Sequence, residues 1–360
     1  MAEDAAWERW VAVPGVIDVA GPRTDGRLVV AGAGALYLLD PASGSLEPFA
    51  RGPGGYHEDP GKEAYLAVSN GGHVDSVGCD FARDEVFILR QHGPFGVNRV
   101  NATGDESGSF ANVPGVSVLT GITFDTGGAF DQRLLVTGRT TAGTTALFAV
   151  DCNGGVTVIT RSIPPVEGGI AVAPNGFGHS GGALIAPDAV SGRVYAIASN
   201  GRVASIGRPS FPRGAEIGVE TVGFVPAGFF DKGGSMYYAD AATGHLLRLS
   251  SAALAAAGAR EGEPLVAAER GAALVAIHCD PSCASTYVIQ TPSRARGEGH
   301  FAFVLNAAEV QPTPPPVGKP AGSSGLVDFV GAWGIPTGVF ILLVAFLAAV
   351  AVQAMRQRAR

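Results

Sequence analysis

Two short loops near the N-terminal end of the chain carry residue types suited to metal binding or acid/base chemistry. His57 lies beside acids in a loop rich in glycine and proline, and His73 and Asp75 follow in a second such loop. Imidazole and carboxylate groups could together ligate a metal ion or exchange a proton with a substrate. Polar residues in such loops are also common as solvated turn formers, so both interpretations stay open. We therefore treat these three residues as ligand or metal candidates at the rim of the fold.

The segment Gly178-His-Ser-Gly-Gly182 fits a pattern in which a sharp turn presents a nucleophilic serine. That chemistry requires a strand before the serine and a helix after it. The corresponding stretch 52 residues later reads Phe230-Asp-Lys-Gly-Gly234, and a strand-like apolar segment follows the Gly-Gly pair in both places. The pattern therefore indicates a structural turn.

Two of the 4 cysteines are separated only by an Asp-Pro-Ser turn. Cys279 and Cys283 can form a disulfide there, which suits an oxidising compartment. A zinc site that includes His278 is the alternative, although no second cluster supplies the remaining ligands. Cys79 and Cys152 stand alone in the sequence, and their pairing stays open.

Composition favours a compact body built from strands. The chain is 46% hydrophobic and 16% charged, so it has enough apolar surface to offset the entropy of ordering. Its 52 glycines and 24 prolines are typical of short strands joined by tight turns. The net charge of −7 gives no basic surface, so we expect no nucleic-acid partner.

An internal repeat predicts the fold. The stretch 174–192 matches the stretch 226–244 in its prolines, its Gly-Phe and Gly-Gly pairs and its final Asp-Ala-x-Ser/Thr-Gly turn. Repeats of this length that contain strands are typical of β-propellers. Related turns predict the same hairpin in four consecutive blades, and they end at Gly44, Gly104, Gly155 and Gly201. We therefore predict an all-β, six-bladed propeller over residues 1–308.

The last two blades follow from continuing the same spacing. The fifth is predicted over 219–268 with a helical insertion at 251–257, and the sixth over 272–305. The N-terminal segments 10–13 and 16–19 would complete the last blade, which would close the ring and remove an exposed sheet edge.

With these strands and turns, the chain resembles the six-bladed propellers of the NHL and gluconolactonase-like (SMP-30-like) superfamily. The segments 183–197 and 235–249 show the pattern of an apolar strand, Asp-x-x-Ser/Thr-Gly and a second apolar strand. The resemblance implies a six-bladed propeller fold. It also implies that those members of the superfamily that are enzymes hold a divalent metal in the axial channel, with Glu, Asn and Asp side chains from the inner strands. Glu167 matches the acid that opens this set, but no Asn or Asp can be assigned at the corresponding start of the other blades.

The C-terminal end predicts a membrane anchor. No charged side chain occurs over 329–355, and three arginines follow within 356–360. About 20 apolar residues are enough for one helix to cross a bilayer. Residues 309–328, rich in Pro, Gly and Ser, would form a stalk between the propeller and this single transmembrane helix.

The charge bias sets the expected orientation. Arginines after the apolar run favour a cytoplasmic C-terminal stub and an extracytoplasmic propeller. The first ten residues are acidic and show no signal peptide. One explanation is that a leader is missing from this sequence. The other is that the body is cytosolic and the anchor inserts tail-first. The charge bias favours a missing leader.

Two classes of function remain. The first is a cell-surface binding or scaffold module that offers its rim to a protein, glycan or small-molecule ligand. The second is a metal-dependent lactonase- or esterase-like hydrolase that uses the central channel. The hydrolase would need a divalent cation, calcium or zinc, with Glu167 among its ligands. The sequence assigns no cofactor firmly.

Overall fold

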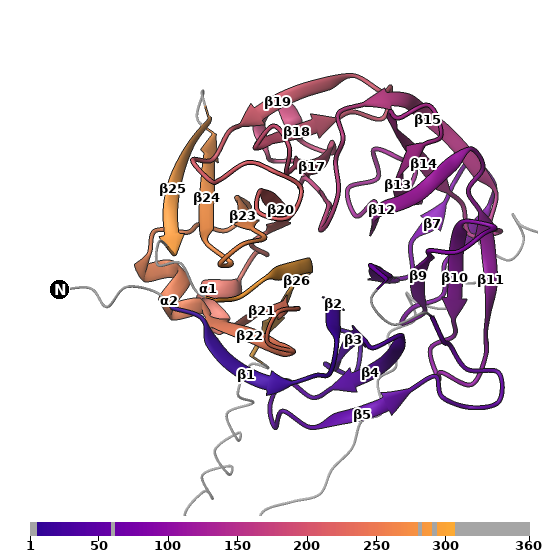
Figure 1. The fold of residues 1–360 in the computed structure, drawn as a ribbon, viewed down its shortest axis with the longest axis horizontal. Coiled ribbons are helices and arrows are strands. Elements are labelled where there is room, and N and C mark those ends of the chain that lie inside the picture. The colour runs from indigo at the N-terminus through magenta and orange to yellow at the C-terminus, as the bar shows by residue number, and fades with distance from the viewer. Residues whose placement is uncertain (1–5, 59–61, 280–282, 290–293, 307–360) are drawn as a thin grey trace, which may run out of the picture. The chain divides into compact units, whose positions relative to one another are not determined.

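The computed structural model describes residues 6–58, 62–279, 283–289 and 294–306, and these residues form a β-propeller. Within these ranges, six four-stranded antiparallel sheets stand around a central axis (Figure 1). The predicted propeller is therefore confirmed. The predicted stalk, transmembrane helix and stub lie outside the described residues, and no helix within the described ranges has the length and apolar character that a membrane crossing needs.

The first four blades are each built from one continuous stretch of chain, and their strands are ordered from the axis outward. The first blade contains β2 (Val16–Ala20), β3 (Leu28–Gly32), β4 (Ala35–Leu39) and β5 (Leu46–Phe49). The second contains β6 (Leu66–Val68), β9 (Val86–Arg90), β10 (Gly96–Val100) and β11 (Ser107–Asn112). The third contains β12 (Val116–Phe124), β13 (Leu134–Thr140), β14 (Thr145–Val150) and β15 (Val156–Ile163). The fourth contains β16 (Ala171–Val172), β17 (Leu184–Asp188), β18 (Arg193–Ile197) and β19 (Val203–Gly207).

The predicted hairpin turns are confirmed in all four of these blades, where each joins the third strand to the outermost strand. In the first blade, Gly44 N donates to Asp40 O at 2.8 Å, and Gly44 has a φ of +75°. Glycine adopts that left-handed angle without strain. In the third blade, the Asp151 carboxylate accepts the Asn153 N–H at 2.9 Å. Such side-chain bonds explain why Asp or Asn opens these turns.

The fifth and sixth blades are interleaved, so the prediction of two consecutive units was wrong. The fifth blade contains β20 (Val219–Phe224), β23 (Pro264–Ala268), β24 (Leu274–Cys279) and β25 (Cys283–Ile289). Between β20 and β23 the chain crosses to the sixth blade and forms β21 (Gly234–Asp240) and β22 (His245–Ser250) there. The inner strand of the sixth blade is β26 (Gly297–Leu305), which pairs with β21. This pairing is non-local, and a fixed spacing along the chain cannot predict it.

Two short helices make these crossings. α1 (Phe229–Lys232) leads into β21, and α2 (Ser251–Ala256) leads back toward β23. The predicted helical insertion at 251–257 is thus confirmed as α2. The Ser250 side chain accepts the Ala253 N–H at 3.1 Å, as expected for a residue that caps a helix N-terminus.

The N-terminal strand closes the ring. β1 (Glu8–Ala12) pairs with β22 as the outermost strand of the sixth blade. The Trp10 ring lies 5.1 Å from the Tyr237 ring, which fixes β1 against β21. Closure by the N-terminus is therefore confirmed for this strand. The segment 16–19 was wrongly included in the closure, because it belongs to β2, the inner strand of the first blade.

The two copies of the repeat occupy similar positions. Each begins after an inner strand, passes through a short helical turn, either η1 (Gly178–Ser180) or α1, and continues as strand, Asp turn and strand. The strand β17 follows Ser180 where a catalytic elbow would need a helix. The second copy differs from the first because its strands belong to the neighbouring blade.

Apolar side chains fill the space between adjacent blades, as Phe87, Phe124 and Phe148 do between the second and third blades. Neighbouring strands within a blade run in opposite directions. All inner strands therefore begin at the same end of the axis, which we call the mouth. The second strand of every blade ends there as well.

Candidate axial site

Acidic residues gather where the inner strands begin. Glu63 and Glu167 lie shortly before β6 and β16, and Glu220 and Glu298 each occupy the second position of an inner strand, β20 or β26. Glu269 directly follows β23, which also ends at the mouth. We call these five residues and Glu216 the axial carboxyl cluster. The topology of the propeller brings together acids that are more than two hundred positions apart in the sequence.

One guanidinium group lies among these acids. Arg296 donates from Nε to Glu269 at 2.7 Å, and its Nη2 lies 2.8 Å from Glu298. The same Nη2 lies 3.3 Å from Glu216 and 3.9 Å from Glu63. Carboxyl groups outnumber the guanidinium, so the mouth is negatively charged when most of them are ionised.

The Tyr65 hydroxyl bridges two buried acids from different blades. It lies 3.2 Å from a carboxyl oxygen of Glu220 and 3.1 Å from one of Glu298. A phenol has one proton, so it can donate to only one of these two groups. The other contact is a hydrogen bond only if that carboxyl group is protonated and donates to the phenol oxygen. If Glu220 or Glu298 carries a proton, both contacts are hydrogen bonds, and the Glu220–Tyr65–Glu298 triad shares that proton.

Burial explains why this proton is retained. It raises the pKa of Glu298 to about 8, while the nearby Glu63 charge adds to the shift and Arg296 opposes it. Burial also raises the pKa of Glu220 well above its usual range, and the Glu298 charge adds to this shift. The triad can therefore exchange a proton close to neutral pH, which is the range that acid/base chemistry uses.

A second buried pair, Asp18 and His300, lies further along the same inner strands. Asp18 on β2 accepts His300 N at 2.6 Å, His300 Nδ1 at 2.9 Å and Leu66 N at 2.7 Å. Burial opposes a charge on this imidazole, but the Asp18 carboxylate outweighs it and raises the pKa of His300. The bonds join three inner strands at the axis.

The glycine between Glu298 and His300 is required by this packing. Gly299 has a φ of +67°, and a Cβ there would lie 2.2 Å from the Asp18 carboxylate. The imidazole Nε2 of His300 is buried near the Ile122 carbonyl without a hydrogen bond of ordinary geometry. These contacts therefore hold β2, β6 and β26 tightly together below the mouth.

Of the residues predicted as ligand or metal candidates, Glu167 is the one that belongs to the axial carboxyl cluster. Glu167 lies 3.8 Å from Arg139 on β13. Burial raises the pKa of Glu167, Arg139 opposes the shift, and Glu63 adds to it. Its predicted position at the start of an inner strand agrees with the structure, whereas its role in binding stays a prediction.

The other predicted residues lie apart from the cluster. His57 is exposed in the loop between the first and second blades. His73 is on β7 (His73–Val74), in an insertion between β6 and β9 that lies at the end of the axis opposite the mouth. There it lies 2.7 Å from Asp80 and 3.6 Å from Asp75. The structure therefore does not bring His57, His73 and Asp75 together with Glu167.

The structure contains two disulfides. Cys279–Cys283 joins the facing ends of β24 and β25, as the spacing predicted. Cys79, on β8 (Cys79–Asp80), pairs with Cys152 in the outer turn of the third blade, which resolves a pairing that the sequence left open. His278, the residue considered as a zinc ligand, instead lies 2.5 Å from Glu263.

The side chains at the mouth do not fit a divalent metal ion as they are placed. The Arg296 guanidinium lies between Glu269 and Glu298, and Tyr65 separates Glu298 from Glu220. Across the ranges that the structure describes, no three His, Cys, Asp or Glu side chains are grouped so that they could hold a metal ion.

Sequence reasoning missed most of the cluster. One sequence signal is common to four members of the cluster, which is a position within a few residues of the start of an inner strand. These members are Glu63, Glu167, Glu220 and Glu298. Recognising that signal for Glu298 required knowing that β26 is an inner strand. Its partner β21 lies far back in the sequence, so the blade count could not supply this information.

Comparisons with known proteins find distant structural similarities and no match in sequence. No family model matches the chain, and no curated protein sequence matches it. A candidate TolB protein from Agrobacterium tumefaciens is 12% identical over 79% of this chain and 83% of that chain, with a TM-score of 0.47. A streptogramin B lyase is 12% identical over 83% of this chain and 94% of that chain, with a TM-score of 0.42. A candidate gluconolactonase is 13% identical over 63% of this chain and 71% of that chain, with a TM-score of 0.37.

Proposed function

We propose that the propeller is the binding module of a membrane-anchored, extracytoplasmic protein and that its mouth recognises a positively charged group. The observation that carries this proposal is the axial carboxyl cluster, in which four of the six glutamates lie within 4 Å of the Arg296 guanidinium. The ligand class that this arrangement favours is an ammonium or guanidinium compound, because clustered carboxylates attract and pair with cations.

The exposed members of the cluster are the groups that a ligand would meet first. The side chain of Glu216 is 77% exposed and that of Glu63 is 49% exposed. Both lie near the Arg296 guanidinium, which is held mainly by the buried Glu269 and Glu298. A cation at the mouth would therefore add a partner for Glu216 and Glu63 without displacing the buried pairs.

Calorimetric titration of the full-length protein in detergent tests the proposal. We expect agmatine and spermidine to bind, and succinate not to bind. Glu216→Gln and Glu63→Gln should each weaken cation binding several-fold, and added salt should weaken it further. Glu47→Gln changes an exposed acid on β5 of the first blade and should leave binding unchanged. If the cations do not bind, or bind equally well to all the variants, the proposal is wrong.

The proposed location rests on the C-terminal charge pattern and on the disulfides. Two disulfides suit an oxidising compartment outside the cytoplasm. Protease treatment of intact cells provides the test. We expect the propeller to be accessible to the protease and the C-terminal stub to be protected, and a protected propeller would overturn the location.

A hydrolase is the second candidate, and the shared proton of the Glu220–Tyr65–Glu298 triad favours it. A protonated carboxyl group beside an ionised one can donate and accept protons during lactone or ester cleavage. Assays with δ-gluconolactone and p-nitrophenyl acetate, in the presence and absence of calcium or zinc, test this candidate. Turnover that Glu298→Gln abolishes would support the hydrolase over the binding module, and absence of turnover under all these conditions would remove it.

A further inference from the structure

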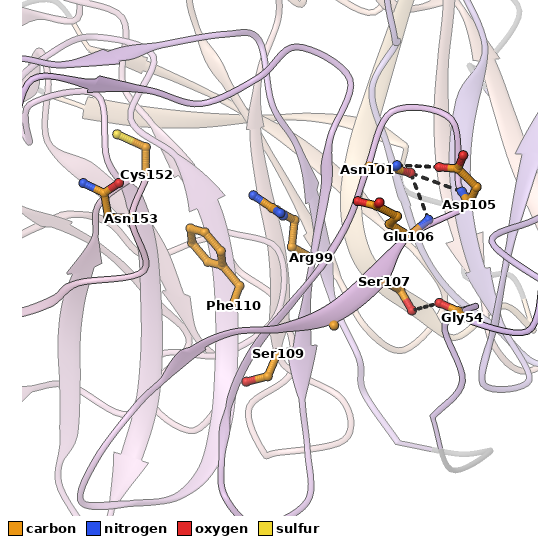
Figure 2. Close-up of a pocket in the computed structure, with 11 residues that line it drawn as sticks. Gly54, Arg99, Asn101, Asp105, Glu106, Ser107, Ser109, Phe110, Cys152 and Asn153 are labelled. Atoms are coloured by element: carbon orange, nitrogen blue, oxygen red, sulfur yellow. Dashed lines mark hydrogen bonds between the residues drawn. The ribbon is translucent and has the colours of Figure 1, made fainter.

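A hollow of about 630 Å³ lies beside β11, the outermost strand of the second blade (Figure 1), and Figure 2 shows the residues that line it. It is formed by β11, the outermost strand of the second blade, by the turn before that strand, and by the outer turn of the third blade. Its volume is within the range of small-molecule sites in proteins. The residues that matter for the argument are Arg99, Asp105, Glu106, Phe110 and Asn153.

The walls of the hollow are held by bonds that require no ligand. The Asn101 side chain accepts the Gly104 N–H at 2.8 Å, which fixes the turn that carries Asp105 and Glu106. Ser107 Oγ donates to Gly54 O at 2.5 Å and ties this turn to the preceding loop. On the opposite wall, the disulfide from Cys152 to Cys79 anchors the turn that carries Asn153. These turns are therefore already ordered in the free protein, so a ligand loses no binding free energy to ordering them.

The hollow combines an apolar surface with hydrogen-bonding groups of both kinds. The Phe110 ring packs at 4.9 Å on the core residue Phe87, and the Arg99 guanidinium carbon lies 5.8 Å from the centre of the Phe110 ring. Asp105 and Glu106 supply acceptors, while the exposed Asn153 amide supplies a donor and an acceptor. In Figure 2, Phe110 and Arg99 lie between the turn that carries Asn153 and the turn that carries Asp105 and Glu106.

The charges narrow the ligand class. Arg99 already faces Glu85 at 3.7 Å, so its charge is partly balanced. The two further carboxylates, Asp105 and Glu106, would repel phosphate, sulfate or uronic acid groups. A sugar ring has hydroxyl groups that both donate and accept, and its C–H face can pack against the negative face of an aromatic ring. We propose that this hollow binds a neutral oligosaccharide.

This site is separate from the mouth and does not depend on the proposed function there. Asn153 and Glu106 are the exposed groups that would contact the sugar hydroxyls, and neither belongs to the folded core. Replacing each by alanine tests binding without disturbing the blades. Asn200→Ala is the matched control, because Asn200 occupies the corresponding outer turn of the fourth blade and lies outside the hollow.

Saturation-transfer NMR on the full-length protein, in a detergent without a sugar headgroup, provides the readout. The probes are maltose, cellobiose, mannobiose and diacetylchitobiose, with a sulfated disaccharide for comparison. We expect at least one neutral disaccharide to bind. Asn153→Ala and Glu106→Ala should each weaken that binding about tenfold, as expected for the loss of one strong hydrogen bond. Asn200→Ala should bind like the native protein.

Three results would overturn the proposal. The first is that no neutral disaccharide binds at millimolar concentration. The second is that Asn153→Ala and Glu106→Ala bind as well as Asn200→Ala does, because the sugar would then bind elsewhere. The third is that the sulfated disaccharide binds more tightly than every neutral probe, because the carboxylates should exclude it.

Discussion

Replacing Glu298 by glutamine should remove part of the pH dependence of folding. Glutamine has the shape of a protonated glutamic acid, so its amide can donate to Tyr65 while its oxygen still accepts from Arg296. Tyr65 can then donate to Glu220. The variant therefore keeps the hydrogen bonds of the triad but has no proton to lose at this position.

The direction in which stability changes with pH follows from the pKa of Glu298. Burial raises it from an ordinary value of 4.5 to about 8, so between these values the folded state binds more protons than the unfolded state. Stability from this group is complete below pH 4.5 and is lost as the pH rises through 8. The slope is at most about 1.4 kcal/mol per pH unit, so the loss from pH 5 to 8 is at most about 4 kcal/mol.

Guanidinium unfolding of the full-length protein, followed by circular dichroism at several pH values, measures this loss. We expect native stability to fall from pH 5 to 8 more steeply than that of Glu298→Gln. The raised pKa of His300 gives a loss of the same sign, but it is present in both proteins and cancels in the difference. Glu47→Gln should follow the native profile. Equal slopes for the native protein and Glu298→Gln would show that Glu298 holds no proton in the folded state.

Three further predictions concern the closed ring and its axis. Replacing both Cys79 and Cys152 by serine should lower the free energy of unfolding by about 2–4 kcal/mol, because their disulfide closes a loop of 73 residues. Denaturant titrations measure this loss, and an unchanged midpoint would contradict the prediction. Asp18→Asn should destabilise the fold by about 3–5 kcal/mol and lower the pKa of His300 in NMR titrations. The substitution removes the buried charge beside His300 and one of the two oxygens that accept four N–H groups. If that pKa stays raised, the Asp18 charge is not its cause. Trp10→Ala should lower the free energy of unfolding by about 2 kcal/mol and speed proteolysis at β1. If the variant resists protease as well as the native protein does, pairing of β1 contributes little to the stability of the ring.

The parts of the fold that could be predicted from the sequence are the local ones. Turns that contain Asp or Asn and end in glycine form within a few residues, because the Asp or Asn side chain binds the backbone of its own turn and glycine supplies the left-handed angle. These rules placed the hairpins of the first four blades and the repeat at 174–192 and 226–244. They do not say which sheet a hairpin joins, so the interleaving of the last two blades could not be predicted.

The candidate site was harder to predict for the same reason. Glu167 could be found because it precedes a strand in a blade whose parts follow one another along the chain. Glu298 becomes a partner of Glu220 only when β26 pairs with β21 and lies beside β20. Tyr65 has no sequence feature that separates it from other buried tyrosines. Its importance comes from the two carboxyl groups on either side of its hydroxyl.

The interleaved blades and the acidic mouth are physically linked. Buried carboxyl groups that repel one another would push β20 and β26 apart, and each costs free energy to desolvate. A propeller resists such a force only if its ring cannot open. Here β21 and β22 leave the fifth blade to pair within the sixth, and β1 then covers the outer edge of that blade. Opening the ring between these two blades would therefore strain the three connections that run between them, from β20 to β21, from β22 to β23 and from β25 to β26. The same non-local pairing that made the site unpredictable from the sequence keeps Glu220 and Glu298 on either side of the Tyr65 hydroxyl.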